Sequence, residues 1–560
     1  MTSDVTVVGI NRTQDGSIAV ARGGSELYSL QKERVSRRKH HWGRLGDLPD
    51  LYLSRMPHLD EPVDLVVECY SSDTEFEKLD AYQDELRRVL RFSDGERVVR
   101  ISHHFAHLYS AFYPSPFDEA AVMVIDAQGS RVKDFNERFE GDEDLDPELL
   151  EVSSFYRCRR GRLECITKQV WDGDWNRPAG LGCFYSLLTR MLFPDGEGSE
   201  GKVMGLAPFG KPGTMGMPSL VVEDHRVFIP DEWMKLFEER DRFRFSGGQA
   251  SFEECANLAA EGQHAFETAL LAVTGWLGEQ TGMRNLCFAG GTALNCSANG
   301  RLVRETAFDK VFIPPSPHDG GTAVGCAVFG LVECLGVDSE FRWVNDFLGP
   351  EPNPSELEQV VRELPPDLVV EKPDDLVERI VELLDTGRVV GVRHGRSESG
   401  PRALGNRSIL ADARNPRMQD FINSQVKGRE WFRPLAPLVL LEAAPAIFDI
   451  DRPAPFMQFA TSVRPEHRDR LPAITHVDGS ARIQTVEPEN TPFLHAILDR
   501  FSSRTGCPVL LNTSLNGKGD PVVETAREAL DCLTTTAMHA MAMPPYLIRK
   551  RAEPPVPARD

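Results

Sequence analysis

The first thirty residues show a succession of strand-like runs that few folds accommodate. Three short β-type runs cover residues 5–10, 17–21 and 26–30. Turn-forming sequences at residues 13–16 and 23–24 separate them. Short runs of this kind with turn signals between them predict an antiparallel meander of three strands.

The segments that follow alternate strand and helix. Asp64 to Tyr70 contains a buried-strand run, residues 74–92 have the spacing of an amphipathic helix, and residues 97–102 are again β-like. A meander followed by β-α-β units is the element order of the ribonuclease-H-like or actin-like ATPase fold. We therefore predict an α/β protein whose N-terminal part has this fold.

The chain is too long for one ordinary core, because its 560 residues exceed the roughly 250–300 at which a single core stops growing. Proline and acidic residues accumulate near residues 349–354, which indicates a linker. We predict an actin-like domain at 1–345, a linker at 346–368, a second α/β domain at 369–547 and a disordered tail at 548–560. The sequence shows no internal repeat.

Composition excludes several classes of partner. Hydrophobic residues make up 41% and charged residues 26%, as in soluble globular proteins. A net charge of −22 argues against nucleic acid, whose phosphates need a basic footprint. No leader peptide or membrane-length apolar run is visible, and the eleven cysteines form no CxxC pair. We expect reduced thiols, a cytoplasmic location and no association with a membrane. The sequence does not fix the oligomeric state, and a homodimer is compatible with it.

Two histidines and an aspartate predict a metal site. His103 and His107 stand four residues apart, so a helix would place both imidazoles on one face. Ser102 would cap this helix, which would stop before Pro114, and Asp126 ends an adjacent apolar strand. These donors suit iron or zinc. The alternative is a pair of surface or otherwise satisfied histidines; the glutamate that zinc proteases carry after the first histidine is absent.

Glycine-rich turns predict phosphate or nucleotide binding. A strand at residues 285–289 runs into Gly290-Gly291, and a second Gly-Gly turn follows Asp319. A strand, a Gly-Gly turn and a helix together expose backbone N–H groups to a phosphate. Asp319 would then be available as a fourth metal ligand. Glycines also flank Lys202, which predicts a contact between this lysine and a phosphate. An ordinary surface turn is the alternative. The nucleotide candidates are Lys202, Gly290, Gly291, Asn295 and Gly321.

The charge balance inverts in the C-terminal part. Residues 388–433 hold ten basic and four acidic residues, although the whole chain is strongly acidic. A pocket for phosphate-bearing substrates would produce this, because arginine binds phosphate bidentately. A solvated helix surface is the alternative, but Arg402 and Arg433 lie in turn sequences, which favours function.

These blocks, taken in order, resemble the carbamoyltransferase family of antibiotic-tailoring and nodulation-factor enzymes. The motifs are HHFAH at 103–107, GGTALN at 290–295, DGGTAVG at 319–325, GPRALGNRSILA at 400–411 and LLNTSLN at 510–516. The resemblance implies an N-terminal domain similar to the transferase that makes threonylcarbamoyl-adenosine in tRNA. It implies a C-terminal domain similar to threonylcarbamoyl-adenylate synthase.

The resemblance also implies a two-site reaction. The C-terminal domain would form carbamoyl-adenylate from carbamoyl phosphate and ATP with Mg²⁺, and the N-terminal domain would pass the carbamoyl group to a hydroxyl of a small secondary metabolite. The family's metal ligands fall on His103, His107, Asp126 and Asp319, with iron favoured over zinc. Its residues for ATP and carbamoyl phosphate fall on Arg402, Lys427, Arg433, Arg482, Asn512 and Ser514.

One turn departs from the family pattern. Members usually carry His-Asp-Ala-Ser where this chain has Gln14-Asp-Gly-Ser17. If that histidine helps to deprotonate the acceptor, Asp15 and His104 are the remaining candidates, and we predict Asp15 as the base. Lys39 lies in a further family-like segment and is the third expected catalytic residue.

Two other functions would use similar sequence features. An actin-like small-molecule kinase also needs Gly-rich phosphate turns and aspartate, but it would leave the basic C-terminal domain without a task. A non-catalytic ATP-binding module would bind nucleotide without turnover. Transfer to tRNA is disfavoured by the charge.

Overall fold

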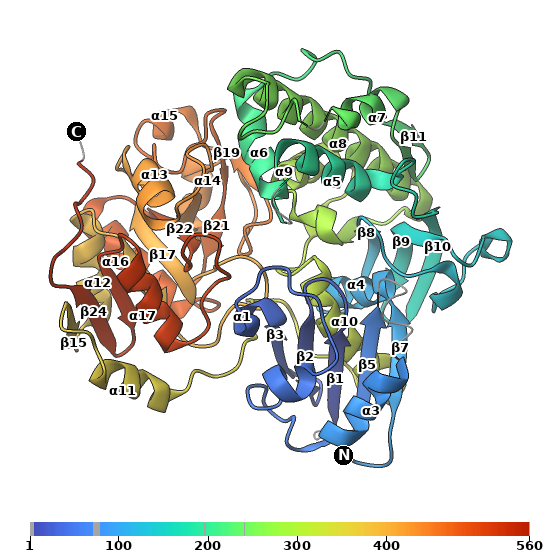
Figure 1. The fold of residues 1–560 in the computed structure, drawn as a ribbon, viewed down its shortest axis with the longest axis horizontal. Coiled ribbons are helices and arrows are strands. Elements are labelled where there is room, and N and C mark those ends of the chain that lie inside the picture. The colour runs from blue at the N-terminus through green and yellow to red at the C-terminus, as the bar shows by residue number, and fades with distance from the viewer. Residues whose placement is uncertain (1–4, 71–78, 195–197, 240, 559–560) are drawn as a thin grey trace. The chain divides into compact units, whose positions relative to one another are not determined.

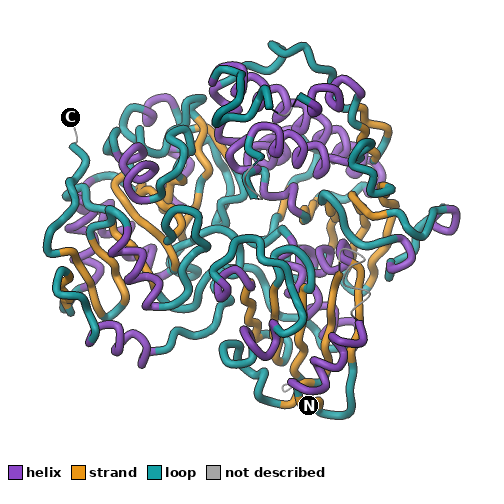
Figure 2. Tube along the Cα trace, in the orientation of Figure 1, coloured by secondary structure: helices purple, strands orange, loops and turns teal. Residues whose placement is uncertain are grey.

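The structure is a computed structural model that describes residues 5–70, 79–194, 198–239 and 241–558 (Figure 1). The chain forms two compact units. The first comprises Met1–Ser36 and His40–Trp343, and the second comprises Arg37–Lys39 and Val344–Asp560. Both units combine helices with β-sheets, so the predicted α/β class is confirmed (Figure 2).

The first sheet has the predicted meander followed by parallel strands. Its order is β3-β2-β1-β5-β7. Strands β1 to β3 are antiparallel, and β5 and β7 add in parallel to β1. The strands are β1 (Thr6–Asn11), β2 (Ser17–Arg22), β3 (Glu26–Gln31), β5 (Leu65–Tyr70) and β7 (Val98–Ser102).

A second sheet repeats this topology. Its order is β10-β9-β8-β13-β14, again with three antiparallel strands followed by two parallel ones. The first unit is therefore a duplicated α/β fold, although its sequence shows no repeat. The strands are β8 (Glu119–Ile125), β9 (Leu150–Arg159), β10 (Arg162–Trp171), β13 (Asn285–Ala289) and β14 (Lys310–Phe312).

Two helices occupy equivalent places after the last strand of each sheet. Helix α4 (His103–Phe112) follows β7, and α10 (Thr322–Phe329) follows β14 through the short 3₁₀ turn η6 (Asp319–Gly321). They pack against each other, α4 lying on β8 and β13 of the second sheet and α10 on β1 and β2 of the first (Figure 1). Gly325 permits this approach, because a Cβ there would lie 1.8 Å from the carbonyl oxygen of Ala106.

Gly325→Ala is expected to destabilise the first unit by about 1–3 kcal/mol, because the added methyl group must push α10 away from the α4 backbone. Gly275→Ala is the matched control. Gly275 also lies inside a helix, but a Cβ there meets no atom within 4 Å. The control should be neutral or more stable by about 0.5–1 kcal/mol from helix propensity. Urea denaturation of both variants measures the difference, and equal midpoints would contradict the packing argument.

The first unit contains further helices beside α4 and α10, several of which pack on one another. The predicted helix over 74–92 is observed as α3 from Leu79, with residues 71–78 outside the described part of the chain. The 30-residue α8 has a complete capping box at Ser251 and Glu254. Among the described residues, no helix is both long enough and apolar enough to cross a bilayer. The other helices are α1 (Lys32–Ser36), α3 (Leu79–Val89), α5 (Gly180–Leu192), α6 (Glu200–Leu206), α7 (Asp231–Glu238), α8 (Phe252–Thr281) and α9 (Cys296–Glu305).

The second unit is built on one mixed sheet of eight strands around a continuous apolar core. In sheet order the strands are β15 (Leu368–Glu371), β24 (Tyr546–Lys550), β23 (Ala540–Met543), β16 (Val390–Arg393), β17 (Arg407–Asp412), β22 (Val509–Ser514), β18 (Ala436–Leu440) and β21 (Gln484–Val486). The longer helices are α11 (Pro354–Arg362), α12 (Leu376–Asp385), α16 (Pro492–Thr505) and α17 (Ala526–Thr535).

Two segments expected to be irregular contain regular structure. Helix α11 lies inside the range expected as a linker, because Asn353 caps it and Pro354 takes the first helical position, where proline is favoured. Strand β24 extends to Lys550, into the range expected as a tail. Beyond it, Glu553 forms an ion pair with Arg388 at 2.7 Å.

Candidate metal centre and basic cluster

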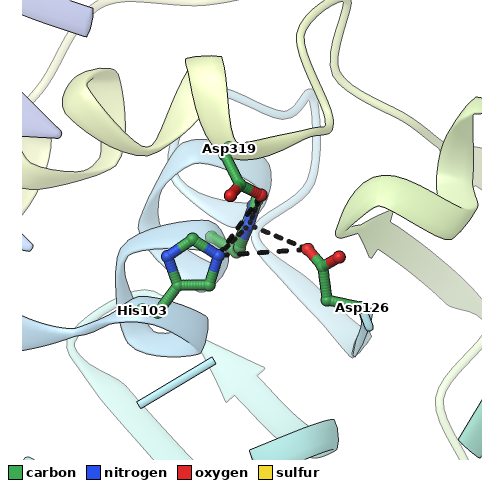
Figure 3. Close-up of side chains that lie close together, drawn as sticks. His103, Asp126 and Asp319 are labelled. Carbon is green, nitrogen blue, oxygen red and sulfur yellow. Dashed lines mark hydrogen bonds and ion pairs between the residues drawn. The ribbon is translucent and has the colours of Figure 1, made fainter. Parts of the chain in front are cut away.

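Two histidines and two aspartates meet in the first unit. The Nε2 atom of His103 lies 3.3 Å from Oδ1 of Asp319, and Nε2 of His107 lies 3.5 Å from Oδ2 of Asp126. The two Nε2 atoms are 3.2 Å apart, and one ligand atom of each residue lies within 4.8 Å of all the others. Figure 3 shows His103, Asp126 and Asp319 pointing toward one another.

The duplicated fold brings these four residues together. His103 is the first residue of α4, and Asp319 opens the turn before the equivalent helix α10. Asp126 follows β8, where its carboxylate accepts the N–H groups of Ala127 at 2.8 Å and of Gly291 at 3.0 Å. The Gly-Gly turn after β13 therefore fixes Asp126. Gly290 has a φ of +94°, and a Cβ there would lie 2.2 Å from the Ile125 carbonyl oxygen.

The charge and donor set of the cluster fit a divalent cation. Burial alone would lower the pKa of His103, but the neighbouring Asp319 carboxylate outweighs it and raises that pKa. Burial would raise the pKa of Asp319, but His103 and His107 hold it well below its usual range. Two imidazole nitrogens and two carboxylates in a buried site are typical ligands of a borderline metal, whose charge would balance the two carboxylates.

His104 belongs to a separate buried network. Its Nδ1 lies 2.7 Å from the Ser154 hydroxyl, and its backbone N–H donates to Glu151 at 3.0 Å. Glu151 in turn pairs with the buried ammonium group of Lys168, which lies 2.6 Å from Glu137. Burial, and then the charge of Lys168, lowers the pKa of His104 well below its ordinary value. His104 is not part of the group formed by His103, His107, Asp126 and Asp319, which we call the metal-like cluster because its side chains could hold a metal ion.

Asp15 lies in the turn between β1 and β2 with its side chain between two histidines. Its Oδ1 is 2.9 Å from Nδ1 of His40, and its Oδ2 is 3.9 Å from Nε2 of His318. The sequence did not indicate the His40 contact, because 25 residues separate the partners. Lys39, the third expected catalytic residue, is exposed and groups with the second unit.

The predicted nucleotide residues of the first unit have structural partners. Asn295 caps α9 by accepting the N–H of Ala298 at 3.1 Å, and it exchanges hydrogen bonds with Gln263. The Gly321 N–H donates to the His318 carbonyl at 2.8 Å. The ammonium group of Lys202, in the first turn of α6, lies 5.3 Å from the centre of the Phe193 ring. A nucleotide-binding role for these residues stays a prediction.

The second unit brings Lys427 and Ser514 together. The Lys427 ammonium donates to the carbonyl oxygen of Ser514 at 2.7 Å and to its hydroxyl at 3.1 Å. It also donates to Asn516, which was not among the predicted residues. Burial, followed by the charge of Arg429, lowers the pKa of Lys427 well below its ordinary value. The depressed pKa therefore reflects mainly burial, with a smaller effect of nearby positive charge.

Three guanidinium groups influence one another in the same unit. Burial and then the charges of Arg433 and Arg482 lower the pKa of Arg429 to about 9. Burial also lowers the pKa of Arg433; Glu430 opposes this effect and Arg482 adds to it. Cations held together with depressed pKa values favour the binding of an anion that neutralises them. Arg429 was not among the predicted residues, although it lies within the basic segment.

The loop that carries Arg402 is fixed by buried groups. Oε1 of Glu398 accepts the N–H groups of Leu404 at 2.7 Å and Asn406 at 2.9 Å. Asn512 donates to the Ala403 carbonyl at 3.0 Å and to Gln484 at 2.8 Å. Asn512 thus contacts the residue next to Arg402. The sequence signal available for Glu398 was an acidic residue within a basic segment.

Comparison with known proteins identifies the family. The model described as carbamoyltransferase N-terminus matches residues 69–328, and that described as carbamoyltransferase C-terminus matches residues 381–550. The chain is 31% identical to 3'-hydroxymethylcephem-O-carbamoyltransferase of Streptomyces clavuligerus, over 92% of this chain and 93% of that protein. It is 34% identical to nodulation protein NolO of Bradyrhizobium diazoefficiens, over 80% of this chain and 79% of that one.

Among solved structures, HypF of T. kodakarensis aligns with a TM-score of 0.40 at 13% identity, over 60% of this chain and 49% of that one. The two family models together cover most of the chain, including both clusters of residues described above. The chain belongs to the carbamoyltransferase family.

Proposed function

We propose that this carbamoyltransferase is an ATP-dependent O-carbamoyltransferase that uses two sites. One observation carries the proposal: residues from the family-like motifs gather into two chemically different clusters. The first unit holds two histidines and two carboxylates, and the second holds a buried lysine and partly buried arginine side chains. The first cluster suits a metal ion and the second suits phosphate groups.

The second unit would activate the carbamoyl group. Carbamoyl phosphate and water give carbamate and phosphate, and the carbamate oxygen then attacks the α-phosphorus of ATP. Carbamoyl-adenylate forms and pyrophosphate leaves. Arg402, Arg433 and Arg482 would neutralise the negative charge that gathers on the phosphates during this attack. Activation is needed because carbamate is a poor electrophile, whereas AMP is a good leaving group.

The first unit would then transfer the carbamoyl group. The acceptor hydroxyl attacks the carbonyl carbon, and the bond from that carbon to the adenylate oxygen breaks to release AMP. His103, His107, Asp126 and Asp319 would hold a divalent ion, which when bound supplies Lewis-acid and template chemistry to the adenylate. The relative's name points to a hydroxymethyl group as the kind of acceptor, so we propose a small hydroxylated metabolite.

Phosphorus NMR of the protein with ATP and Mg²⁺, with and without carbamoyl phosphate, tests the first half-reaction. Pyrophosphate that forms only with carbamoyl phosphate is the expected result. ADP without pyrophosphate would overturn the proposal and indicate a kinase. No turnover with bound ATP would indicate a binding module.

Arg433→Met is expected to lower the rate of pyrophosphate release about 100-fold, because one preorganised cation at the phosphates is lost. Arg452→Met is the matched control. The two arginine side chains have nearly equal exposure, 30% and 29%, but Arg452 pairs with its neighbour Asp451 at 2.9 Å. Equal rates for the two variants would contradict the assignment of the basic cluster as the adenylation site.

A further inference from the structure

The pair formed by His40 and Asp15 has the geometry of a general base and its orienting carboxylate. The Asp15 side chain is 8% exposed, so its carboxylate is nearly buried, whereas the His40 side chain is 26% exposed. The hydrogen bond of 2.9 Å joins Oδ1 of Asp15 to Nδ1 of His40. This bond leaves Nε2 as the ring nitrogen that can accept a proton.

Both residues of the pair have an uncommon backbone conformation. Asp15 and His40 both adopt left-handed backbone conformations, with φ of +50° and +51°. Side chains other than glycine adopt this region rarely, and such strain persists where the surrounding structure holds it, often at functional sites. Nε2 of His40 faces Gly198, where a Cβ would lie 1.9 Å from that nitrogen. Only glycine leaves room for the ring as it stands.

The pair is tied to the metal-like cluster. The Asn11 amide group donates to the backbone carbonyl of Asp15 at 3.2 Å and to that of Asp319 at 3.0 Å. His318 also connects Asp15 to the cluster. Its Nε2 lies 3.9 Å from the Asp15 carboxylate, and it directly precedes Asp319 in the chain. Asp15, which contacts His40, is therefore connected to the Asp319 backbone through Asn11 and His318.

We propose that His40 is the general base for the acceptor hydroxyl and that Asp15 is its positioning residue. Nε2 of His40 takes the hydroxyl proton while the oxygen attacks the carbamoyl carbon and AMP leaves; the proton then passes to water. This assignment rests on the proposed function, and it replaces our prediction from the sequence that Asp15 itself is the base.

The groups facing His40 define the pH dependence. Burial lowers its pKa, but the hydrogen bond and charge of Asp15 outweigh this, with further help from Glu33 on α1 and Glu200 on α6, and the pKa rises to about 9. His318 faces the other side of Asp15. Because the base must be neutral, the transfer rate should rise about tenfold per pH unit up to about pH 9.

The test measures AMP release with 3'-hydroxymethylcephem as acceptor, and with water alone, from pH 6 to pH 10. His40→Gln should lower the rate of AMP release at pH 9 at least about 100-fold and make that rate independent of pH. Its rate of pyrophosphate release should stay unchanged. Asp15→Asn should move the inflection down by at least one pH unit, toward the ordinary histidine pKa. A purely structural role of Asp15 would not shift this inflection.

His58→Gln is the matched control. His58 also has a positive φ, of +63°, and its Nδ1 also lies 2.9 Å from a carboxylate, that of Glu61. It should behave as wild type. His40→Gln with wild-type AMP release and pH slope, or a wild-type protein that releases pyrophosphate but no AMP with either nucleophile, would overturn the assignment. Absence of pyrophosphate from the wild type would instead overturn the proposed function.

Discussion

Asp319→Asn should abolish metal retention and carbamoyl transfer while leaving pyrophosphate release intact. The substitution keeps the size of the side chain, and the hydrogen bonds from Asn11 and Thr322 go to the Asp319 backbone carbonyl, so the turn should stay folded. Loss of one of two carboxylates removes a full negative charge from the cluster. Substituting a residue that only supports a metal ligand typically lowers metal affinity about 10–100-fold. Because Asp319 would be a ligand itself, we expect metal affinity to fall at least about 100-fold.

Metal content per chain and the rates of the two half-reactions measure this outcome. Asp309→Asn serves as a control, because Asp309 is an exposed residue of the same unit that pairs with Arg284. Its metal content and rates should equal those of the wild type. If Asp319→Asn retained both metal and transfer, the four-residue cluster would not be the metal site.

Lys168→Met is expected to destabilise the first unit by about 3–5 kcal/mol, the largest stability change that we predict. The ammonium group is fully buried between Glu137 and Glu151, and its removal leaves both carboxylates without their partner. Glu151 also holds the N–H groups of His104 and Ser130, so the start of α4 should loosen too. Urea denaturation measures the effect.

Lys133→Met is the control for this prediction, because Lys133 pairs with Glu148 at the surface, where both side chains are about half exposed. An exposed pair contributes about 0–1 kcal/mol. Burial lowers the pKa of Lys168, but Glu137 and Glu151 outweigh it and raise that pKa above its ordinary value. The stabilisation by Lys168 is therefore present at neutral pH and is lost only as the pH rises through that raised pKa. A stability difference between wild type and Lys168→Met that vanished at pH 7 would contradict this view.

Local sequence signals were sufficient for the first sheet and for the residues of the cluster. Alternating short runs and turn residues predicted β1 to β3, and the four-residue spacing of His103 and His107 placed both imidazoles on one helix face. Asp126 and Asp319 were located because each ends or follows an apolar strand. These signals are local in the chain, so one sequence reveals them.

Contacts between distant segments could not be predicted in this way. Nothing in the sequence near Lys168 indicates its carboxylate partners, and the range 134–175 showed no motif, although it holds β9 and β10. The sequence also did not indicate that the Gly291 N–H donates to the Asp126 carboxylate. The expected contact of the Gly290-Gly291 turn with a nucleotide stays a prediction.

The exchange of α4 and α10 between the two sheets has a consequence for how the first unit can be divided. Each helix continues from one sheet but covers the apolar face of the other. A fragment that ended after β7 would lack α10 and would expose the face of β1 and β2 to water. A fragment that began at β8 would lack α4 in the same way. Although the topology is duplicated, neither copy is self-contained, and the two are expected to fold only together.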